Sequence, residues 1–465
     1  MGTSTAPRIA SQISYSDLYA RWERGHWLAT EIDFTQDRID WQEKLTEGER
    51  AAALWFFALF FHGEDEVADD LSPYVEAAPI EEQTYFLTTQ QVDESRHSVF
   101  FNRFMHEVVG LGDGTPGAGL QATEGHLTWG HRETFKNLAK VAHELHADRS
   151  PEKFAEAVTN YHVIVEGTLA QPGQHMMEAW LERRGILPGF LAGMQKISVD
   201  EQRHIAFGMK TLSDLYETDP VGIGDVIVDA VRTSGAALMA FAYPSGGRAF
   251  LEPMGVDLAA LYGESMRALD SRLKGIGLTG EQRQRAMTID PSLSFGQQGE
   301  RVLQLLDAGY VGDGTLPKSK RPEDVEVLFS MIANVIEAYP PKDGTVVQFD
   351  LTDVGARHYV RSGGELEYHQ GPHPAPSVSL RLSLDDFADL IAERANPVKL
   401  LLLRRLRISG DRGLLMGSRS IFGPAPGTRS KPTRAASPKG LALLRSALPY
   451  PGRVAQRLVA RPAAR

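Results

Sequence analysis

The 465-residue chain contains no cysteine. It therefore forms no disulfide bond, and it offers no thiolate for a zinc site or an iron–sulfur cluster. Any metal ion must be held by nitrogen and oxygen ligands, which suit iron and manganese. Long hydrophobic runs are also absent: the longest, AAALWFFALFF at 51–61, has 11 residues, whereas a membrane-spanning helix needs about 20. Because the N-terminal residues lack the layout of a signal peptide, we expect a cytoplasmic protein.

Acidic residues are missing from the C-terminal end of the chain. Nine of the 49 Lys and Arg residues follow Pro424 with no acid among them, which leaves 40 bases against 60 acids in residues 1–423. An acidic body of this kind argues against nucleic acid as the main partner. The tail is rich in Pro, Ser, Ala and Arg, and this composition predicts that residues 424–465 are a disordered basic tail.

The hydrophobic pattern divides the remaining sequence into a helical part and a part with both helices and strands. Residues 1–290 show apolar residues at spacings of three and four, which predicts helices. Residues 291–322 have the Gly, Pro and Lys content of a linker. Residues 323–423 alternate at 345–351 and 377–384 around a helical stretch at 385–395, which predicts a small α+β domain with antiparallel strands. The helical segments expected in the first part are 46–76, 80–109, 123–147, 151–183, 188–216, 221–243 and 256–275.

A Glu-x-x-His unit occurs twice in the helical part, as VDESRH at 92–97 and VDEQRH at 199–204. Residues i and i+3 share one face of a helix, so each glutamate points the same way as its histidine. Two further acids, Glu64 and Glu166, lie in apolar stretches 30 and 35 residues before the glutamates of the two motifs. Each gap fits one helix, a turn and a returning helix.

Four carboxylates on buried helix faces would destabilise the fold unless cations accompany them. Two helices that give one Glu each, and two that give Glu-x-x-His, form the ligand set of dinuclear sites in ferritin-like bundles. A single Glu-x-x-His would indicate a surface ion pair, but the doubled pattern with its preceding acids favours the metal site. We therefore predict a mainly α, ferritin-like di-metal bundle, with Asp65 as the alternative to Glu64. The predicted ligands are Glu64, Glu94, His97, Glu166, Glu201 and His204.

Residues 15–220, and the stretch 26–71 above all, resemble the ribonucleotide reductase small-subunit superfamily and, within it, the ligand-binding oxidase branch. Val67 lies three residues after Glu64 and Tyr161 five before Glu166, the spacing of that branch's Val–Tyr ether cross-link. The resemblance implies manganese and iron, alternatively two irons, as well as dioxygen, a long-chain fatty acid or similar lipid, and a homodimer. It also implies that Trp27 and Asp200 form a pair that orients a ligand histidine, although Trp27 alone could be a core aromatic.

Tyr161 poses a geometric problem, because residues five apart lie about 140° from each other around an ideal helix. Tyr161 can approach the metals only if the helix is distorted there, as by a π-bulge, or if the ring lies to one side, toward Val67. A buried tyrosine with an ordinary hydrogen bond is the alternative.

The expected function is a dioxygen-activating oxidase that removes two electrons from a lipid. Radical-bearing reductase subunits usually carry tyrosine four residues after the first motif histidine, and Phe101 stands there. Phenylalanine has no phenol to oxidise, which weakens the alternative hypothesis that the protein is a ribonucleoside-diphosphate reductase small subunit. A non-catalytic protein that anchors a lipid through its metals is another alternative, and ferritin-type metal handling is disfavoured.

Residues 323–423 resemble the sterol carrier protein type 2 fold, most clearly in VSLRLSLDDFADLIAERANPVKLLLLRRLRISGDRGLLMG. That resemblance implies an apolar tunnel for acyl chains or sterols. Arg404 and Arg405 stand where the family often has glycine, so a purely structural domain is the alternative.

Overall fold

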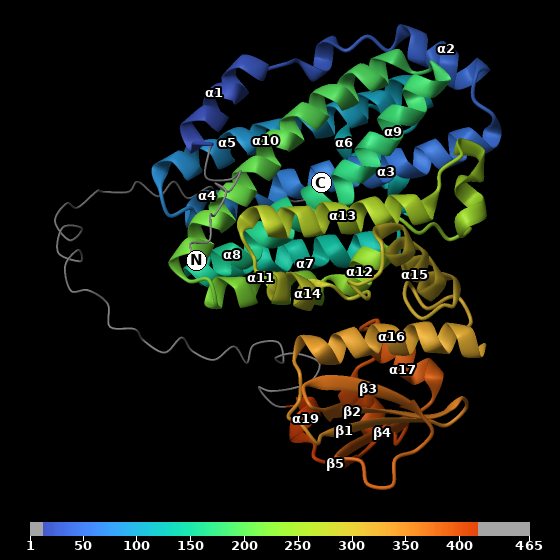
Figure 1. Ribbon diagram of the computed structural model, residues 1–465. Coiled ribbons are helices and arrows are strands. Elements are labelled where there is room, and N and C mark those ends of the chain that lie inside the picture. The colour runs from blue at the N-terminus through green and yellow to red at the C-terminus, as the bar shows by residue number, and fades with distance from the viewer. Residues whose placement is uncertain (1–12, 417–465) are drawn as a thin grey trace, which may run out of the picture.

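The computed structural model describes residues 13–416 (Figure 1). A bundle of long helices lies above a smaller unit of helices and strands, which confirms the predicted mainly α fold followed by a small α+β part. The predicted basic tail, residues 424–465, lies outside the described residues. Among the described helices, none is both long and apolar enough to cross a bilayer.

Four helical segments form the centre of the bundle: α3 (Glu47–Asp70), α5 (Glu81–Phe104), the segment from α8 (Pro151–Val158) through η5 (Thr159–Ala170) to α9 (Gln171–Arg184), and α10 (Pro188–Thr218). Helix α3 begins with a capping box, in which Thr46 and Glu49 satisfy each other's backbone N–H groups. Helix α10 begins with a proline and is capped from a distance, because the Asp37 carboxylate accepts the backbone N–H groups of Gly189 and Phe190 at 2.9 and 2.7 Å.

Element η5 is a π-helix of 12 residues. In a π-helix the hydrogen bonds run from i to i+5, so residues five apart lie on nearly the same side. The first of the two arrangements expected for Tyr161, a distorted helix, is therefore present. Helix α10 approaches η5 closely at Gly208, where an added Cβ would overlap the side chain of His162.

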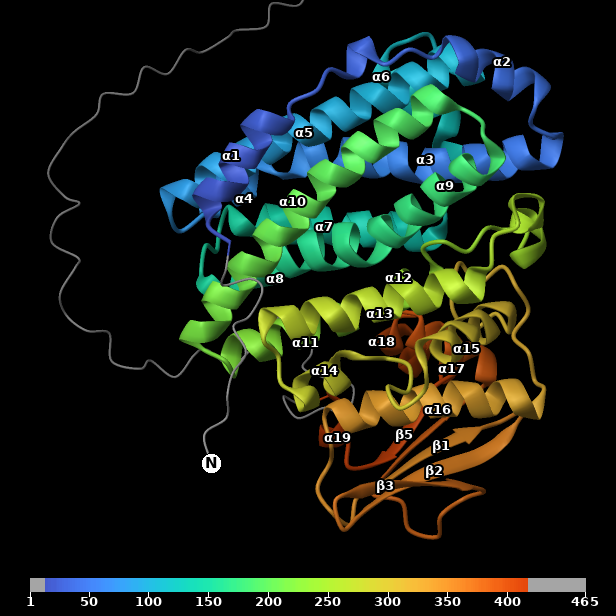
Figure 2. The ribbon, with the colours of Figure 1, turned by 45° about the horizontal axis from the view of Figure 1, so that its top comes forward.

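Further helices surround this centre, and α13 closes its lower side (Figure 2). The predicted linker contains α15 (Phe295–Asp307), which packs against α13 so closely that a Cβ at Gly299 would overlap the Ala259 carbonyl. The surrounding elements are α1 (Tyr15–Gly25), η2 (Ala29–Glu31), α2 (Thr35–Glu43), α4 (Ser72–Ala77), η3 (Met105–Val109), α6 (Pro116–Thr123), η4 (Glu124–His126), α7 (Trp129–Leu145), α11 (Gly222–Thr233), α12 (Gly235–Ala240), η6 (Arg248–Met254), α13 (Leu258–Ile276) and α14 (Gly280–Ala286).

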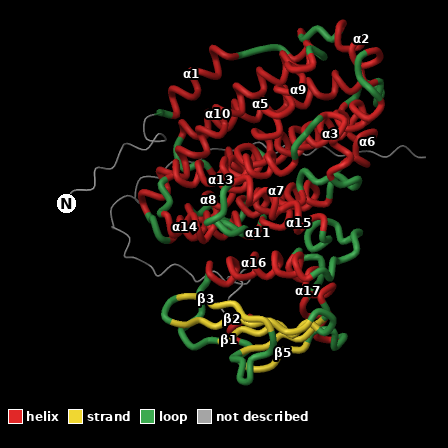
Figure 3. Tube along the Cα trace, turned by 45° about the vertical axis from the view of Figure 1, so that its right-hand side comes forward, coloured by secondary structure: helices red, strands yellow, loops and turns green. Residues whose placement is uncertain are grey.

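The C-terminal part is one five-stranded sheet beneath α16 (Figure 3), with strand order β3-β2-β1-β4-β5. Strands β1 and β4 pair in parallel and the other neighbours pair antiparallel, so the expectation of antiparallel strands holds for all but that pair. A parallel pair requires a crossover, which β2 and β3 provide. The elements are α16 (Pro322–Ala338), β1 (Val346–Leu351), β2 (Gly355–Ser362), β3 (Glu365–Gln370), β4 (Val378–Leu382), α17 (Leu384–Ile391), α18 (Pro397–Leu402), β5 (Arg407–Gly410) and α19 (Gly413–Met416).

The two parts share a continuous apolar cluster, which includes Phe57 of α3, Leu306 of α15 and Phe349 of β1. The end of α16 is also held by the bundle: the Tyr339 hydroxyl donates to Asp229, and the Arg232 guanidinium lies 5.5 Å from the Tyr339 ring centroid.

Candidate metal centre

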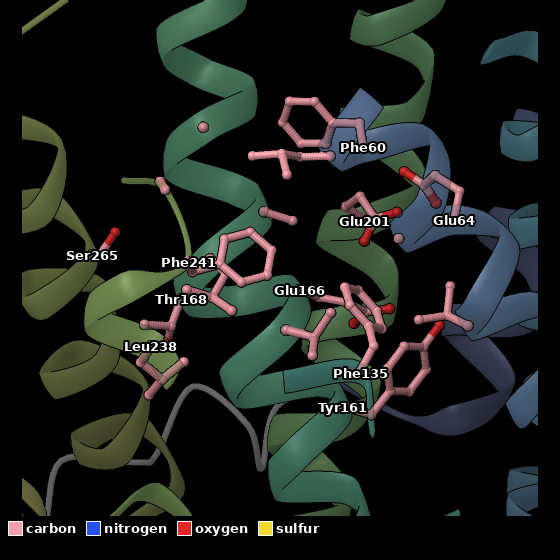
Figure 4. A pocket seen from close by; sticks show the side chains of 18 of the residues that line it. Phe60, Glu64, Phe135, Tyr161, Glu166, Thr168, Glu201, Leu238, Phe241 and Ser265 are labelled. Atoms are coloured by element: carbon pink, nitrogen blue, oxygen red, sulfur yellow. The ribbon is translucent and has the colours of Figure 1, made fainter. Parts of the chain in front are cut away.

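The six predicted ligand side chains converge in the middle of the bundle. None is more than 7% exposed. They form two groups that share Glu94, and within each group one donor atom per residue lies within 4.8 Å of the others. Figure 4 shows Glu64 from α3, Glu166 from η5 and Glu201 from α10 at one end of a cavity. The groups are Glu64, Glu94, His97 and Glu201, and Glu94, Glu166 and His204.

Each histidine turns its Nδ1 atom toward three of the carboxylates. His97 Nδ1 lies 3.2, 3.3 and 3.5 Å from oxygens of Glu64, Glu94 and Glu201. His204 Nδ1 lies 3.1, 3.4 and 3.8 Å from oxygens of Glu94, Glu166 and Glu201. Glu94 and Glu201 therefore reach both histidines, each with a different oxygen, whereas Glu64 and Glu166 are each near one histidine. If two ions were bound here, Glu94 and Glu201 would be within reach of both, and Glu64 and Glu166 of one each.

The opposite ring nitrogen, Nε2, of each motif histidine contacts the aspartate of the other motif. His97 Nε2 lies 3.1 Å from Asp200, which precedes Glu201, and His204 Nε2 lies 3.1 Å from Asp93, which precedes Glu94. An aspartate at Nε2 keeps a proton there and leaves Nδ1 to face the carboxylates. Each copy of Asp-Glu-x-Arg-His thus orients the histidine of the other copy.

Arg96 and Arg203 join the two aspartates into one buried network. Arg203 donates to Asp93 at 2.6 Å and to Asp200 at 2.9 Å, and Arg96 donates to the same two carboxylates. Two buried cations therefore balance two buried anions, and the charge of the four glutamates is left to other partners.

Two tryptophans complete this network. The Trp27 indole donates to Asp200 at 2.8 Å, the contact that the family resemblance implied, and its ring stacks on His97. The Trp22 indole makes the matching bond to Asp93 at 2.8 Å. Trp22, Asp93, Arg96 and Arg203 were not among the residues predicted from the sequence. The identical Asp and Arg positions in VDESRH and VDEQRH were the available signal.

Taken by themselves, the side chains of the cluster carry too little positive charge for their carboxylates. Burial, together with repulsion by Glu201 and Glu94, raises the pKa of Glu64 to about 8. Burial and the Glu201 carboxylate hold the pKa of Glu166 well above its usual value. Burial by itself would lower the pKa of His97 and His204, but the carboxylates around them raise both well above the ordinary histidine value. The raised pKa values mean that protons on these glutamates and histidines offset the excess of negative charge in the cluster.

The donor set fits two metal cations. Glu166 Oε2 is fully buried and has no hydrogen-bond partner among the described residues, while His204 Nδ1 faces carboxylate oxygens without a well-aligned hydrogen bond to any of them. Buried polar atoms normally have partners, so both atoms are available to bind a cation. Carboxylate oxygens with imidazole nitrogens, and no thiolate, suit iron or manganese. Asp65, the alternative to Glu64, lies outside both groups and accepts a bond from Ser98 at 3.1 Å.

Tyr161 lies beside the cluster, because η5 places it on the same side as Glu166. Its hydroxyl donates to Glu94 Oε1 at 2.7 Å. Val67, its predicted cross-link partner, lines the same cavity and is 5% exposed. Gln90, which the sequence analysis also missed, donates to Glu166 at 2.8 Å and lies 3.1 Å from His162. Phe101 is fully buried among aromatic rings, including Phe60.

An apolar cavity leads from the carboxylates toward α12 and α13 (Figure 4). Its polar lining atoms away from the cluster are satisfied within the protein: the hydroxyls of Thr168, Tyr262 and Ser265 donate to backbone carbonyls at 2.7, 2.6 and 3.2 Å. The other lining residues there are aliphatic or aromatic, such as Phe135, Leu238 and Phe241. A molecule that fills this cavity meets charge at one end and hydrocarbon along the rest.

The helical bundle and its buried cluster of carboxylates and histidines are those of a ferritin-like di-metal oxidoreductase. Residues 11–232 match the family described as Ribonucleotide reductase, small chain. Residues 340–423 match the SCP-2 sterol transfer family. The chain is thus similar to the ribonucleotide reductase small chain in one segment and to the SCP-2 family in another, which confirms both resemblances seen in the sequence.

Solved structures of R2-like ligand-binding oxidases are similar to this chain. A valine-to-leucine variant with an anaerobically reconstituted Mn/Fe cofactor is 27% identical, with a TM-score of 0.50, over 58% of this chain and 96% of that chain. A tyrosine-to-phenylalanine variant, also with a Mn/Fe cofactor, is 28% identical, with the same TM-score and the same coverage.

Proposed function

We propose that the chain is a dioxygen-activating oxidase with a heterodinuclear Mn/Fe centre, alternatively an Fe/Fe centre, that oxidises a lipid or fatty-acid-like ligand by two electrons. The observation that carries the proposal is the buried cluster of four glutamates and two histidines at the end of an apolar cavity. Glu64, Glu94, His97, Glu166, Glu201 and His204 are the proposed ligands. The Mn/Fe cofactors of the similar oxidases support the choice of metals.

Two redox-active ions, when bound, would supply the reduction of dioxygen to two waters, for which they give two electrons and the substrate bond gives two. The protein's own residues do the rest. The Asp93 and Asp200 carboxylates fix both imidazoles, and the apolar lining excludes water from the reacting groups. The cavity fits a carboxylate-bearing lipid because, apart from the cluster, its polar lining atoms are already satisfied.

The first bond oxidised is proposed to be within the protein, as an ether between the Tyr161 oxygen and the Val67 β-carbon. Tyr161 loses its hydroxyl proton and Val67 loses one hydrogen from Cβ, so that two protons and two electrons leave as the C–O bond forms. Glu94 Oε1, 2.7 Å from the Tyr161 oxygen, is positioned to accept the hydroxyl proton. A homodimer is the proposed assembly.

Aerobic loading with manganese and iron, followed by elemental analysis and tryptic mapping, tests the proposal. Tyr161 and Val67 lie in the peptides 154–183 and 51–96. The expected product is those two peptides joined and lighter by two hydrogens, in a chain with both metals. The Tyr161→Phe variant should retain the metals without the joined peptide. The matched control is Tyr74→Phe, because the Tyr74 ring lies next to Tyr161 and its hydroxyl donates to a backbone carbonyl.

Three outcomes count against the proposal. A chain with both metals and separate peptides after aerobic loading contradicts the cross-link. Stoichiometric complex formation with a large reductase subunit, together with nucleotide reduction, favours a reductase small subunit over an oxidase. An unchanged bound lipid after repeated exposure to dioxygen and reductant indicates the non-catalytic, metal-anchored binding protein.

A further inference from the structure

The segment that matches the SCP-2 family has an exposed apolar turn at α18, which is labelled between α13 and α16 in Figure 2. Val398, Leu402 and Leu403 are 57%, 79% and 55% exposed, and Leu402 is the most exposed large apolar side chain of residues 13–416. Val398 and Leu402 lie four residues apart and so share one helix face. Single exposed apolar side chains are common, but three in one turn form a patch that indicates an interaction site.

The turn is held in place from below, so the exposure is not fraying of a chain end. Leu400 and Leu406 are 4% and 3% exposed and anchor the turn in the apolar cluster. The Asn396 side chain caps the helix by accepting the N–H groups of Val398 and Lys399 at 2.9 and 3.2 Å. The Leu400 carbonyl closes the other end by accepting the Arg405 N–H at 2.9 Å.

The charged side chains of residues 396–410 are all basic. Lys399, Arg404 and Arg407 are exposed, and residues 396–410 contain no acid. Arg405 is paired with Asp386, but the three exposed bases have no ion pair within residues 13–416. The whole chain carries a formal charge of −11, so this turn is a local exception on an acidic protein. Its partner should be apolar and negatively charged.

We propose that the α18 surface, defined as Val398, Leu402 and Leu403 with Lys399, Arg404 and Arg407, docks the protein on an anionic lipid bilayer. The aliphatic side chains would enter the boundary between headgroups and acyl chains while the bases contact the anionic headgroups. The chain's own tail is a poor occupant, because residues 424–465 carry nine bases and no acid and are repelled by the surface. The surface belongs to the segment that matches a sterol transfer family, so docking brings that domain to a source of lipid. The inference does not depend on the metal centre.

The absence of cysteine makes the test direct, because a single introduced cysteine can be labelled without competition. The full chain carrying Leu402→Cys is labelled with an environment-sensitive fluorophore and mixed with vesicles of phosphatidylcholine alone or with about one third phosphatidylglycerol. The emission should shift to shorter wavelength with the anionic vesicles. Val221→Cys is the matched control, because Val221 is 72% exposed but lies between Asp219 and Asp225 in the sequence. Its label should not shift.

Co-flotation of unlabelled full chain supplies the quantitative arm. Leu402→Gln combined with Leu403→Gln should lower partitioning onto anionic vesicles by roughly 10- to 100-fold. Lys399→Gln and Arg407→Gln should each lower it about fivefold, and added salt should weaken it further. An unchanged melting temperature of these surface variants establishes that the fold is intact.

Four results would overturn the proposal. The first is equal shifts of the two labels, which indicates non-specific adsorption. The second is binding that survives the double leucine variant, which assigns the binding to the tail. The third is equal binding to neutral and anionic vesicles, which removes the role of the bases. Absence of any binding to anionic vesicles at low salt also refutes it.

Discussion

Exchanging Asp93 or Asp200 for asparagine should weaken one metal position and spare the other. Asp93 accepts bonds from Trp22, Arg203 and His204 at 2.8, 2.6 and 3.1 Å. In Asp93→Asn, the asparagine amide keeps the shape of the side chain but loses its charge. The tautomer of His204 is then no longer fixed, and Arg96 and Arg203 have only the Asp200 carboxylate to pair with. Loss of such an outer carboxylate lowers metal affinity by about 10- to 100-fold, which corresponds to about 1.4–2.7 kcal/mol.

The two aspartates serve as controls for each other because Asp93 contacts His204 and Asp200 contacts His97. Asp93→Asn should weaken the position near His204 and Glu166, and Asp200→Asn the position near His97 and Glu64. Chelator competition, titrated in steps, should therefore show one weakened and one unchanged metal in each variant.

Combination with a terminal ligand distinguishes the two positions. Adding Glu166→Ala to Asp93→Asn should cost no second metal, whereas adding Glu64→Ala should remove both. Asp65→Asn, on the same helix as Glu64 but outside the cluster, should retain both metals at the original affinity. If either aspartate variant lowers the metal affinity of both positions equally, or of neither, then the claim that each aspartate orients the histidine of the other motif is wrong.

Three further predictions follow from burial and close packing. Metal binding must displace the proton of Glu64, whose pKa is raised to about 8, and that of His97, whose pKa the carboxylates around it also raise, so affinity at that position should rise with pH. Isothermal titration across pH should show this slope, and Glu64→Gln should make it shallower below about pH 8. Gly208→Ala should force apart α10 and η5 at His162, costing about 1–3 kcal/mol of unfolding free energy and reducing metal retention, whereas Gly296→Ala, with open space around its Cβ, should do neither. Burial lowers the pKa of His131 to about 3, whereas the unfolded side chain titrates near 6.5. The stability that the neutral side chain gives is therefore present above pH 6.5, and the free energy of unfolding falls by about 1.4 kcal/mol per pH unit below it. Urea unfolding of His131→Gln should show a shallower fall with decreasing pH, and an equal slope would count against the burial argument.

The metal cluster was predictable from sequence because helical periodicity puts i and i+3 on one face. Glu94 with His97 and Glu201 with His204 follow from that rule, and the gaps to Glu64 and Glu166 follow from the length of a helix pair. The convergence of all four segments follows from the cost of isolated buried carboxylates. These arguments need no knowledge of which helices cross.

The contacts that orient the histidines were not predictable from that rule. Asp93 and Asp200 point away from the faces of Glu94 and Glu201, and their partners lie about a hundred residues away along the chain. Trp22 joins them from a helix whose position depends on the packing of the whole bundle. Such cross-chain pairs depend on how the helices cross, which periodicity does not specify.

The distortion at Tyr161 was partly predictable. The five-residue separation from Glu166 required either a π-type distortion or a sideways tyrosine, and η5 supplies the first. The extent of η5, and its close contact with α10 at Gly208, depend on tertiary packing. The helix α15 within the predicted linker was obscured by the Gly, Pro and Lys residues that follow it, although its apolar face packs on α13.

The most direct test of the account is anomalous X-ray scattering from crystals of the full chain loaded with manganese and iron, recorded at both absorption edges. The account predicts two peaks inside the cluster, one beside Glu64 and His97 and one beside Glu166 and His204, with Glu94 and Glu201 between them. Peaks elsewhere, or six side chains unchanged around an empty centre after loading, would contradict it.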